Sequence, residues 1–201
     1  MQILKGIDLY PHIGEYDCVL IGTNIYNTMS QGIQLQVMLN YPHVYEENLK
    51  TKYADQEKLG TILKCEKEGE QSFCLCFITD SYGFRPDLNK DFLSYESLEK
   101  CLKLISVLYK DKKLACTLLG ASRFDGNGDR DRILEIFNNT VKDMDITIYD
   151  YYQKSRKEML HETYAKEQEV KKKDRDEYYK MVIQRKKEAN DRYKKNGHRR
   201  Y

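Results

Sequence analysis

Apolar positions in the first 150 residues follow two different periods. The runs 18–23 and 73–79 are short and almost wholly apolar, which is typical of strands buried on both faces of a sheet. Segment 95–109 instead repeats apolar residues every three to four positions, which predicts an amphipathic helix. The same criteria predict further strands at 2–9, 60–66, 114–119 and 145–149 and further helices at 31–39 and 133–141. We expect Pro42 to stop the first helix.

Strands that alternate with helices in this way predict an α/β fold over residues 1–150. The expected architecture is a three-layer α/β/α sandwich with a mixed, largely parallel sheet. Ligands of such sheets bind outside the carboxyl ends of the strands. Two loops at such ends, 24–32 and 120–129, are rich in Gly, Asn and Ser, and each leads into a helix. Free N–H groups there suit an anion, although a plain chain turn explains each loop equally well.

Residues 151–201 predict a second region, a long C-terminal α-helix. Up to residue 195 they contain neither Pro nor Gly, and only a thin stripe of aromatic and apolar residues follows the helical period. They carry 17 basic and 9 acidic side chains, a net charge of +8, whereas residues 1–150 carry 17 and 23, a net charge of −6. Three interpretations stay open for this basic extension: a solvated helix, a surface for a protein partner or for self-association, and a nucleic-acid contact.

Composition narrows the chemistry. The six cysteines form no Cys-x-x-Cys pair and mostly lie in apolar runs, which indicates buried thiols in a reducing compartment. No apolar run approaches the ~20 residues of a membrane span, so we expect no membrane partner and a cytoplasmic protein, or a viral one in the host cytoplasm or virus particle. Asp125, Asn127 and Asp129 imitate the start of a calcium loop, but the glycine is misplaced and the closing glutamate is absent. The scattered histidines have no ligand spacing, so neither a metal nor a cofactor is expected.

Four short motifs, in this order, resemble the macro domain, the ADP-ribose-binding module. They are "GIDLY" at 6–10, "DCVLIGTN" at 17–24, "SQGIQ" at 30–34 and "LLGASRFDGNGD" at 118–129. The resemblance covers about residues 1–150. It implies ADP-ribose, a nucleotide-like small molecule, as the ligand.

The resemblance also implies a role for each matching residue. Asp8 would accept a hydrogen bond from the adenine amino group, and Asn24 would bond the distal ribose. The backbone at Gly32 and Ile33 would hold one phosphate. The second loop would hold the other phosphate through its backbone and pack an aromatic ring on the ribose, with the implied residues being Gly120, Ala121, Ser122, Arg123, Phe124 and Gly126.

Departures from the family pattern bear on activity. Ile21 stands where the family has its first asparagine, and the second loop lacks the usual Gly-x-Gly opening. One branch of the family removes ADP-ribose from proteins with a lysine nucleophile after the strand that matches 73–79, where this chain has Thr79-Asp80-Ser81. Asp125 stays as a candidate acid or base, but a carboxylate without the lysine cannot run that covalent route.

We therefore expect a module that binds ADP-ribose or a related nucleotide without hydrolysing it, with a basic helical tail for partner binding. As an enzyme it would be an ADP-ribose-linkage hydrolase. The alternatives are a structural or assembly protein, such as a virus-particle component that binds neighbouring subunits through its C-terminal helix, and a degenerate fold that has lost its ligand.

Overall fold

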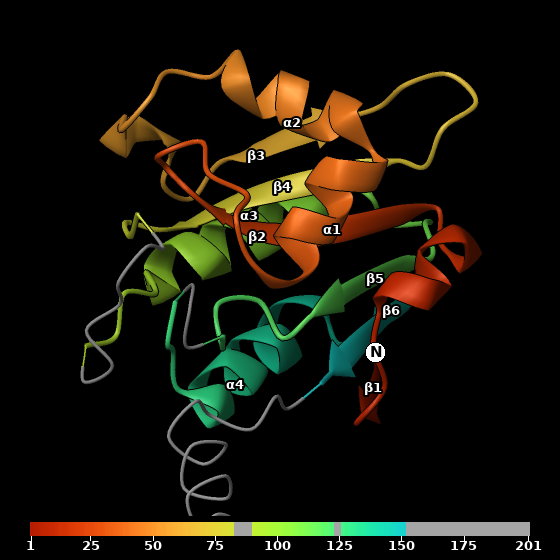
Figure 1. Cartoon of the computed structure of the whole chain (residues 1–201). Coiled ribbons are helices and arrows are strands. Elements are labelled where there is room, and N and C mark those ends of the chain that lie inside the picture. The colour runs from red at the N-terminus through yellow and green to blue at the C-terminus, as the bar shows by residue number, and fades with distance from the viewer. Residues whose placement is uncertain (83–89, 123–125, 152–201) are drawn as a thin grey trace, which may run out of the picture. The chain divides into compact units, whose positions relative to one another are not determined.

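A six-stranded sheet lies between two layers of helices (Figure 1). The computed structural model describes residues 1–82, 90–122 and 126–151. The chain divides into two units at Tyr152, and the first, Met1–Tyr152, holds every element described. The predicted helix over 151–201 therefore lies outside the described residues, apart from Tyr151.

The strands run in the order β1-β6-β5-β2-β4-β3. Only β3 is antiparallel to its neighbour, β4, and every other neighbouring pair is parallel. The predicted mixed, largely parallel sheet is confirmed. The strands are β1 (Gln2–Lys5), β2 (Cys18–Asn24), β3 (Ile62–Cys65), β4 (Phe73–Thr79), β5 (Leu114–Thr117) and β6 (Ile146–Asp150).

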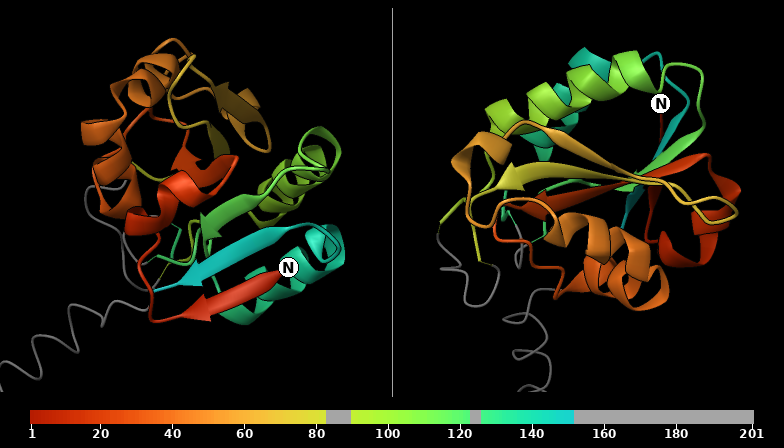
Figure 2. Two further views of the ribbon diagram at one scale, coloured as in Figure 1. Left: turned by 90° about the vertical axis from the view of Figure 1, so that its right-hand side faces the viewer. Right: turned by 90° about the horizontal axis from the view of Figure 1, so that it is seen from above.

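Two helices cover each face of the sheet, as the view along its edge shows (Figure 2, right). One layer holds α1 (Gly32–Asn40) and α2 (Pro42–Leu49), and the other holds α3 (Tyr95–Leu108) and α4 (Arg130–Val141). Side chains of β4 alternate between the two cores. Phe73 and Leu75 pack in the core beside α1 and α2, whereas Cys74, Cys76 and Ile78 pack in the core beside α3 and α4.

The sequence predicts that Pro42 stops a helix, but in the structure Pro42 also starts one. The first helix ends at Asn40, and Pro42 is the first residue of α2, which the sequence pattern does not predict. Proline is accommodated at the first position of a helix because its missing N–H has no intrahelical acceptor there. The same residue therefore separates two helices.

The first predicted strand is too long. It covers residues 2–9, but β1 ends at Lys5 because Gly6 takes a left-handed conformation, with φ of +74°. A 3-10 helix follows at Tyr10–Glu15, and a second one at Gln56–Lys58 precedes β3. The second short helix contains Lys58, which donates to Asn27 in the loop after β2.

Within the part of the chain that the structure describes, no helix is both long and apolar enough to cross a membrane.

Candidate functional site

The carboxyl ends of β2 and β5 lie side by side at the point where the chain reverses its course across the sheet. From β2 the chain continues to β3 and β4 on one side, and from β5 to β6 on the other. The two loops singled out in the sequence start at these adjacent ends. A Cβ atom added to Gly22 of β2 would lie 3.7 Å from the Gly120 backbone nitrogen, so the two backbones are in contact distance. Such a switch point is where ligands of open α/β sheets bind.

Asn24 organises the first of these loops with its side chain, which is 3% exposed. Its Nδ2 donates to Thr28 Oγ1 at 2.7 Å and to the Thr28 carbonyl at 3.2 Å. Its Oδ1 accepts from the backbone N–H groups of Tyr26, at 2.9 Å, and Thr28, at 3.4 Å. Both amide donors and both carbonyl lone pairs are therefore engaged. A ribose hydroxyl at Asn24 would have to replace one of these bonds.

Helix α1 begins directly after this loop and is fixed to β2 through Gln34. The buried Gln34 side chain donates from Nε2 to the Gly22 carbonyl at 2.7 Å. The helix starts at Gly32, with φ of +53°, and Leu35 N donates to the Gln31 carbonyl at 3.2 Å. The N–H groups of Gly32 and Ile33 thus belong to the first turn, where no intrahelical acceptor exists. The positive end of the helix dipole therefore lies at the carboxyl edge of the sheet.

The second loop folds back on itself around glycine. Gly120 has φ of +78°, and its carbonyl accepts from Gly128 N at 3.0 Å. Ala121 N donates to the Leu118 carbonyl at 3.1 Å, and Asn127 N donates to the Ser122 carbonyl at 2.8 Å. Gly120 thus lies close to Gly126 and Gly128, and Ser122 is bonded to Asn127.

A neighbouring segment locks the second loop in place. The N–H groups of Phe92 and Leu93 both donate to the Gly126 carbonyl, at 2.7 and 3.0 Å. Ser94 N donates to the Ile78 carbonyl at 2.9 Å, which joins this segment to β4. The backbone of the second loop is therefore held by contacts on either side.

Asp8 lies further along the same edge, after β1. It is exposed, and its Oδ1 accepts from Tyr10 N at 3.1 Å. Because β1 and β2 are separated by β6 and β5, three strand spacings, or about 14 Å, divide their carboxyl ends. Asp8 and the two loops are therefore at the same edge of the sheet but follow different strands.

Three of the implied site residues, Arg123, Phe124 and Asp125, lie outside the described residues. Two positions of the calcium-like motif are described. Asp129 Oδ1 caps α4 by accepting from Arg132 N at 2.8 Å, and Asn127 Nδ2 donates to the Lys90 carbonyl at 3.0 Å. Among residues 1–82, 90–122 and 126–151, no three His, Cys, Asp or Glu side chains gather as metal ligands would.

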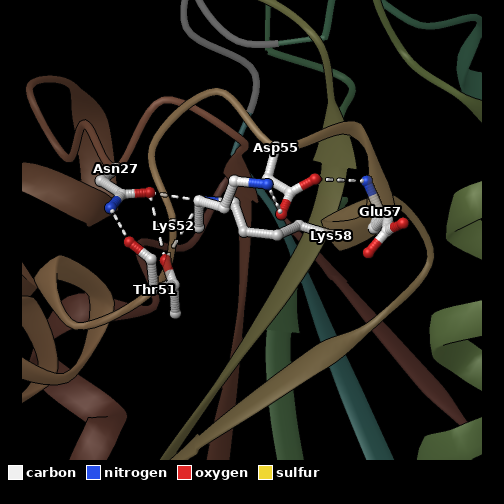
Figure 3. Close-up of polar contacts among 6 residues, drawn as sticks. All are labelled: Asn27, Thr51, Lys52, Asp55, Glu57 and Lys58. Carbon is white, nitrogen blue, oxygen red and sulfur yellow. Dashed lines mark hydrogen bonds and ion pairs between the residues drawn. The ribbon is translucent and has the colours of Figure 1, made fainter.

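A buried lysine, Lys58, contacts the first loop at Asn27 (Figure 3). Lys58 is 8% exposed and donates from Nζ to Asn27 Oδ1 and, at 3.1 Å, to Thr51 Oγ1. Its Nζ also lies 4.8 Å from the centroid of the Phe77 ring. Asn27, with φ of 55°, donates in turn to the Thr51 carbonyl at 2.8 Å. The cluster joins the loop after β2 to the segment after α2.

Burial lowers the pKa of the Lys58 ammonium, and the nearby Asp55 carboxylate only partly opposes this shift. Asp55 is occupied elsewhere: it accepts from Glu57 N at 3.1 Å and pairs with Lys52 at 3.3 Å. Nothing in the sequence around Lys58 indicates its burial, because a lysine in "DQEKLG" is normally exposed. Sequence reasoning therefore missed this contribution to the site.

Several solved structures share this architecture. The sequence matches no protein-family profile and no curated protein. Among solved structures, Thermosipho africanus DarTG in complex with ADP-ribose superposes with a TM-score of 0.60 at 17% identity, over 77% of this chain and 43% of that one. The macrodomain of Thermus aquaticus DarG gives 0.57 at 14% identity, over 76% and 97%. A Bacteroides thetaiotaomicron protein of unknown function gives 0.58 at 16% identity, over 75% and 98%.

The fold is that of a macrodomain, as the four sequence motifs predicted. Identities of 14–17% establish the fold alone. The ligand has to be argued from the residues of this chain.

Proposed function

We propose that this chain binds ADP-ribose or a closely related nucleotide diphosphate at the carboxyl edge of its sheet. One observation carries the proposal: the loop that leads from β2 to the start of α1 and the glycine-rich turn after β5 leave the same edge of the sheet from two adjacent parallel strands. Backbone N–H groups at such turns suit the two phosphates of a diphosphate, and they need no particular side chains. The ADP-ribose bound to the DarTG neighbour, which shares this fold, makes that ligand the first to test.

Asn24 has a different role in this proposal from a direct ribose contact. Because its amide groups are engaged by Tyr26 and Thr28, it acts first by shaping the loop that presents the α1 N-terminus. We infer that Asn24→Ala weakens binding through the loop. Asp8 is exposed and accepts a hydrogen bond from Tyr10 N on Oδ1, and its carboxylate has further lone pairs for an adenine amino group.

Isothermal titration calorimetry with ADP-ribose tests the proposal. We expect measurable binding, weakened about tenfold by Asp8→Ala, since a hydrogen bond to a charged group is lost. Asp143→Ala is the matched control, because Asp143 is an exposed carboxylate that precedes β6 at the opposite edge of the sheet. Absence of heat at millimolar ADP-ribose would reject the proposal.

Binding without hydrolysis is the form of the activity we propose. Asp80 and Ser81 follow β4 where one branch of the family carries its lysine nucleophile, and a carboxylate cannot form the corresponding Schiff base. Incubation of the chain with an ADP-ribosylated protein should leave the modification in place. Release of ADP-ribose would contradict this part of the proposal.

For the basic extension, 151–201, we propose binding to a protein partner or to a second copy of the chain. Its charge of opposite sign to the body and its stripe of tyrosines support such a role. An assembly protein that reuses the macrodomain fold is the alternative for the whole chain. Calorimetry separates the two, because a pure assembly component needs no affinity for ADP-ribose.

A further inference from the structure

Three tyrosines form an exposed aromatic surface immediately beside Asn24. The Tyr26 ring lies 5.8 Å from that of Tyr53 and 5.7 Å from that of Tyr82, edge to face in both cases. Tyr53 is 59% exposed and Tyr82 53% exposed. Such large exposed rings, clustered on three separate segments of chain, are more typical of a binding surface than of a solvated loop.

A carboxylate is built into this surface. Asp80 accepts from the Tyr26 hydroxyl on Oδ1 at 2.7 Å and from Gln56 Nε2 on Oδ2 at 3.0 Å. The hydrogen bond to Asp80 raises the pKa of the Tyr26 hydroxyl. Each carboxylate oxygen has a second lone pair, so the exposed Asp80 can accept two further bonds. We call Tyr26, Tyr53, Tyr82 and Asp80 the tyrosine rim.

The tyrosine rim lies beside the first loop, on the β4 side of the two turns. Tyr26 N donates to Asn24 Oδ1, and Asp80 directly follows Thr79, the residue paired with Asn24 in the sheet. In the proposed binding mode the adenine lies at Asp8, after β1, and the diphosphate at the turns after β5 and β2, so the ribose at the other end of the ligand extends toward β4 and the rim. Whatever group the ribose is attached to in a modified target would therefore lie on the rim.

We propose that the tyrosine rim recognises an arginine side chain that carries the ADP-ribose, so that the ligand of this chain is ADP-ribosylated arginine in a protein. The inference rests on the proposed function. A guanidinium is planar, stacks on aromatic faces and offers paired donors that match a carboxylate, which fits the rings and Asp80 together.

Charge favours a peptide over a nucleic acid at this surface. Residues 1–150 carry a net charge of −6, and the rim itself presents the side chain of Asp80. A phosphate backbone would be repelled by both, whereas a cationic side chain is attracted. Lys52, next to Tyr53 in the sequence, pairs with Asp55 at 3.3 Å.

The test compares four ligands by calorimetry on the full chain. They are free ADP-ribose, a short peptide with ADP-ribose on its single arginine, the same peptide with ADP-ribose on serine, and an oligonucleotide with ADP-ribose on a base. We expect the arginine-linked peptide to bind about tenfold more tightly than the serine-linked one. Tyr53→Ala and Asp80→Asn should abolish this preference and leave the affinity for free ADP-ribose within about twofold.

Matched variants separate the rim from general damage. Tyr53→Phe keeps the ring and should keep the preference. Asp111→Asn removes an exposed carboxylate in the turn before β5, at the opposite edge of the sheet, and should change nothing. Thermal melting of each variant verifies that it is folded.

Each contrary result has a distinct meaning. Equal affinity for the two peptides, or an Asp80→Asn variant that loses free ADP-ribose as well, overturns the inference and leaves the proposed function intact. Tighter binding of an oligonucleotide ADP-ribosylated on a base overturns it in favour of nucleic acid. No binding of free ADP-ribose rejects the proposed function, and the inference with it.

Discussion

Gly126 shows how single residues determine the geometry of the second loop. A Cβ atom at this position would lie 2.3 Å from the Gly120 carbonyl oxygen, which is a backbone atom and cannot rotate away. Gly126 also accepts the N–H groups of Phe92 and Leu93 on its own carbonyl. One glycine thus permits the contact between two segments of the site.

Gly126→Ala should therefore destabilise the protein by about 2 kcal/mol, in the range of overpacked interiors, and weaken ADP-ribose binding. Urea denaturation and calorimetry measure the two effects. Gly14→Ala is the control, because a Cβ there meets no atom within 4 Å. Equal stability of the two variants would contradict the steric argument.

Ionisation of the Cys65 thiol should make the free energy of unfolding depend on pH in the alkaline range. Burial, with a smaller contribution from Cys74, raises its pKa from 9.0 to about 12. The folded protein therefore retains the thiol proton while the unfolded chain loses it above pH 9, so this contribution to stability is present below pH 9 and lost as the pH rises toward 12.

Cys65→Ala should remove that part of the pH dependence. In urea denaturation between pH 8 and 10.5, the stability difference between the natural protein and the variant should narrow as the pH rises. Ser106→Ala, a partly exposed substitution in α3, should leave the difference constant. A constant difference for Cys65→Ala would show that its thiol titrates normally in the folded state.

At the scale of elements, capping determines where the long helices start. Ser94 caps α3 by accepting from Ser97 N at 3.2 Å, and Asp129 caps α4. Phe92 and Leu93, which donate to the second loop, directly precede α3. Ser94 N then donates to the Ile78 carbonyl of β4. The helix starts are thus part of the carboxyl edge.

Ser94→Ala should lower the free energy of unfolding by about 1 kcal/mol, the usual cost of a lost N-cap. Ser106→Ala makes the same change in the last turn of the same helix, where Ser106 only donates to the Lys103 carbonyl. It should change stability by less than about 0.5 kcal/mol. Chemical denaturation of the pair isolates the cap, and equal costs would reject a capping role for Ser94.

Elements with a strong, uninterrupted pattern were predictable from the sequence. The strand Phe73–Thr79 has the predicted bounds, and α3 ends one residue before its predicted end. Helix α2 was missed because Pro42 is compatible with both the end and the start of a helix, and only packing of Val44 against the sheet decides. The extent of β1 depended on the conformation of Gly6, which no periodicity reports.

The candidate site also has a part that could be predicted from the sequence and a part that could not. Backbone turns leave a signature in the sequence, so a loop after β2 and a glycine-rich turn after β5 could be predicted. The tyrosine rim and the Lys58 cluster could not, because each collects residues from segments more than 20 positions apart. Tertiary contacts of single side chains have no local pattern to reveal them.

At the scale of the whole molecule, the chain combines an acidic body with a basic extension. The compact unit Met1–Tyr152 contains the complete sheet and all four described α-helices. Residues 152–201 supply the excess of positive charge that brings the net value to +2. Body and extension can therefore be tested separately.

Deletion of residues 153–201 should leave a folded protein with unchanged affinity for ADP-ribose. The same deletion should abolish assembly, so that light scattering gives the mass of a single body. The full chain under the same conditions is the reference. A truncated protein with the same association state as the full chain would reject an assembly role for the extension.

The six buried cysteines also allow unfolding of this chain to be followed through their thiol groups. All of them are free thiols inside the body, and the sequence contains no tryptophan to supply the usual fluorescence signal. A thiol reagent can reach them only when the core opens, so labelling kinetics followed by mass spectrometry would record opening events one sulfur at a time. Ligands that tighten the carboxyl edge would then be detected by slower labelling, without any introduced probe.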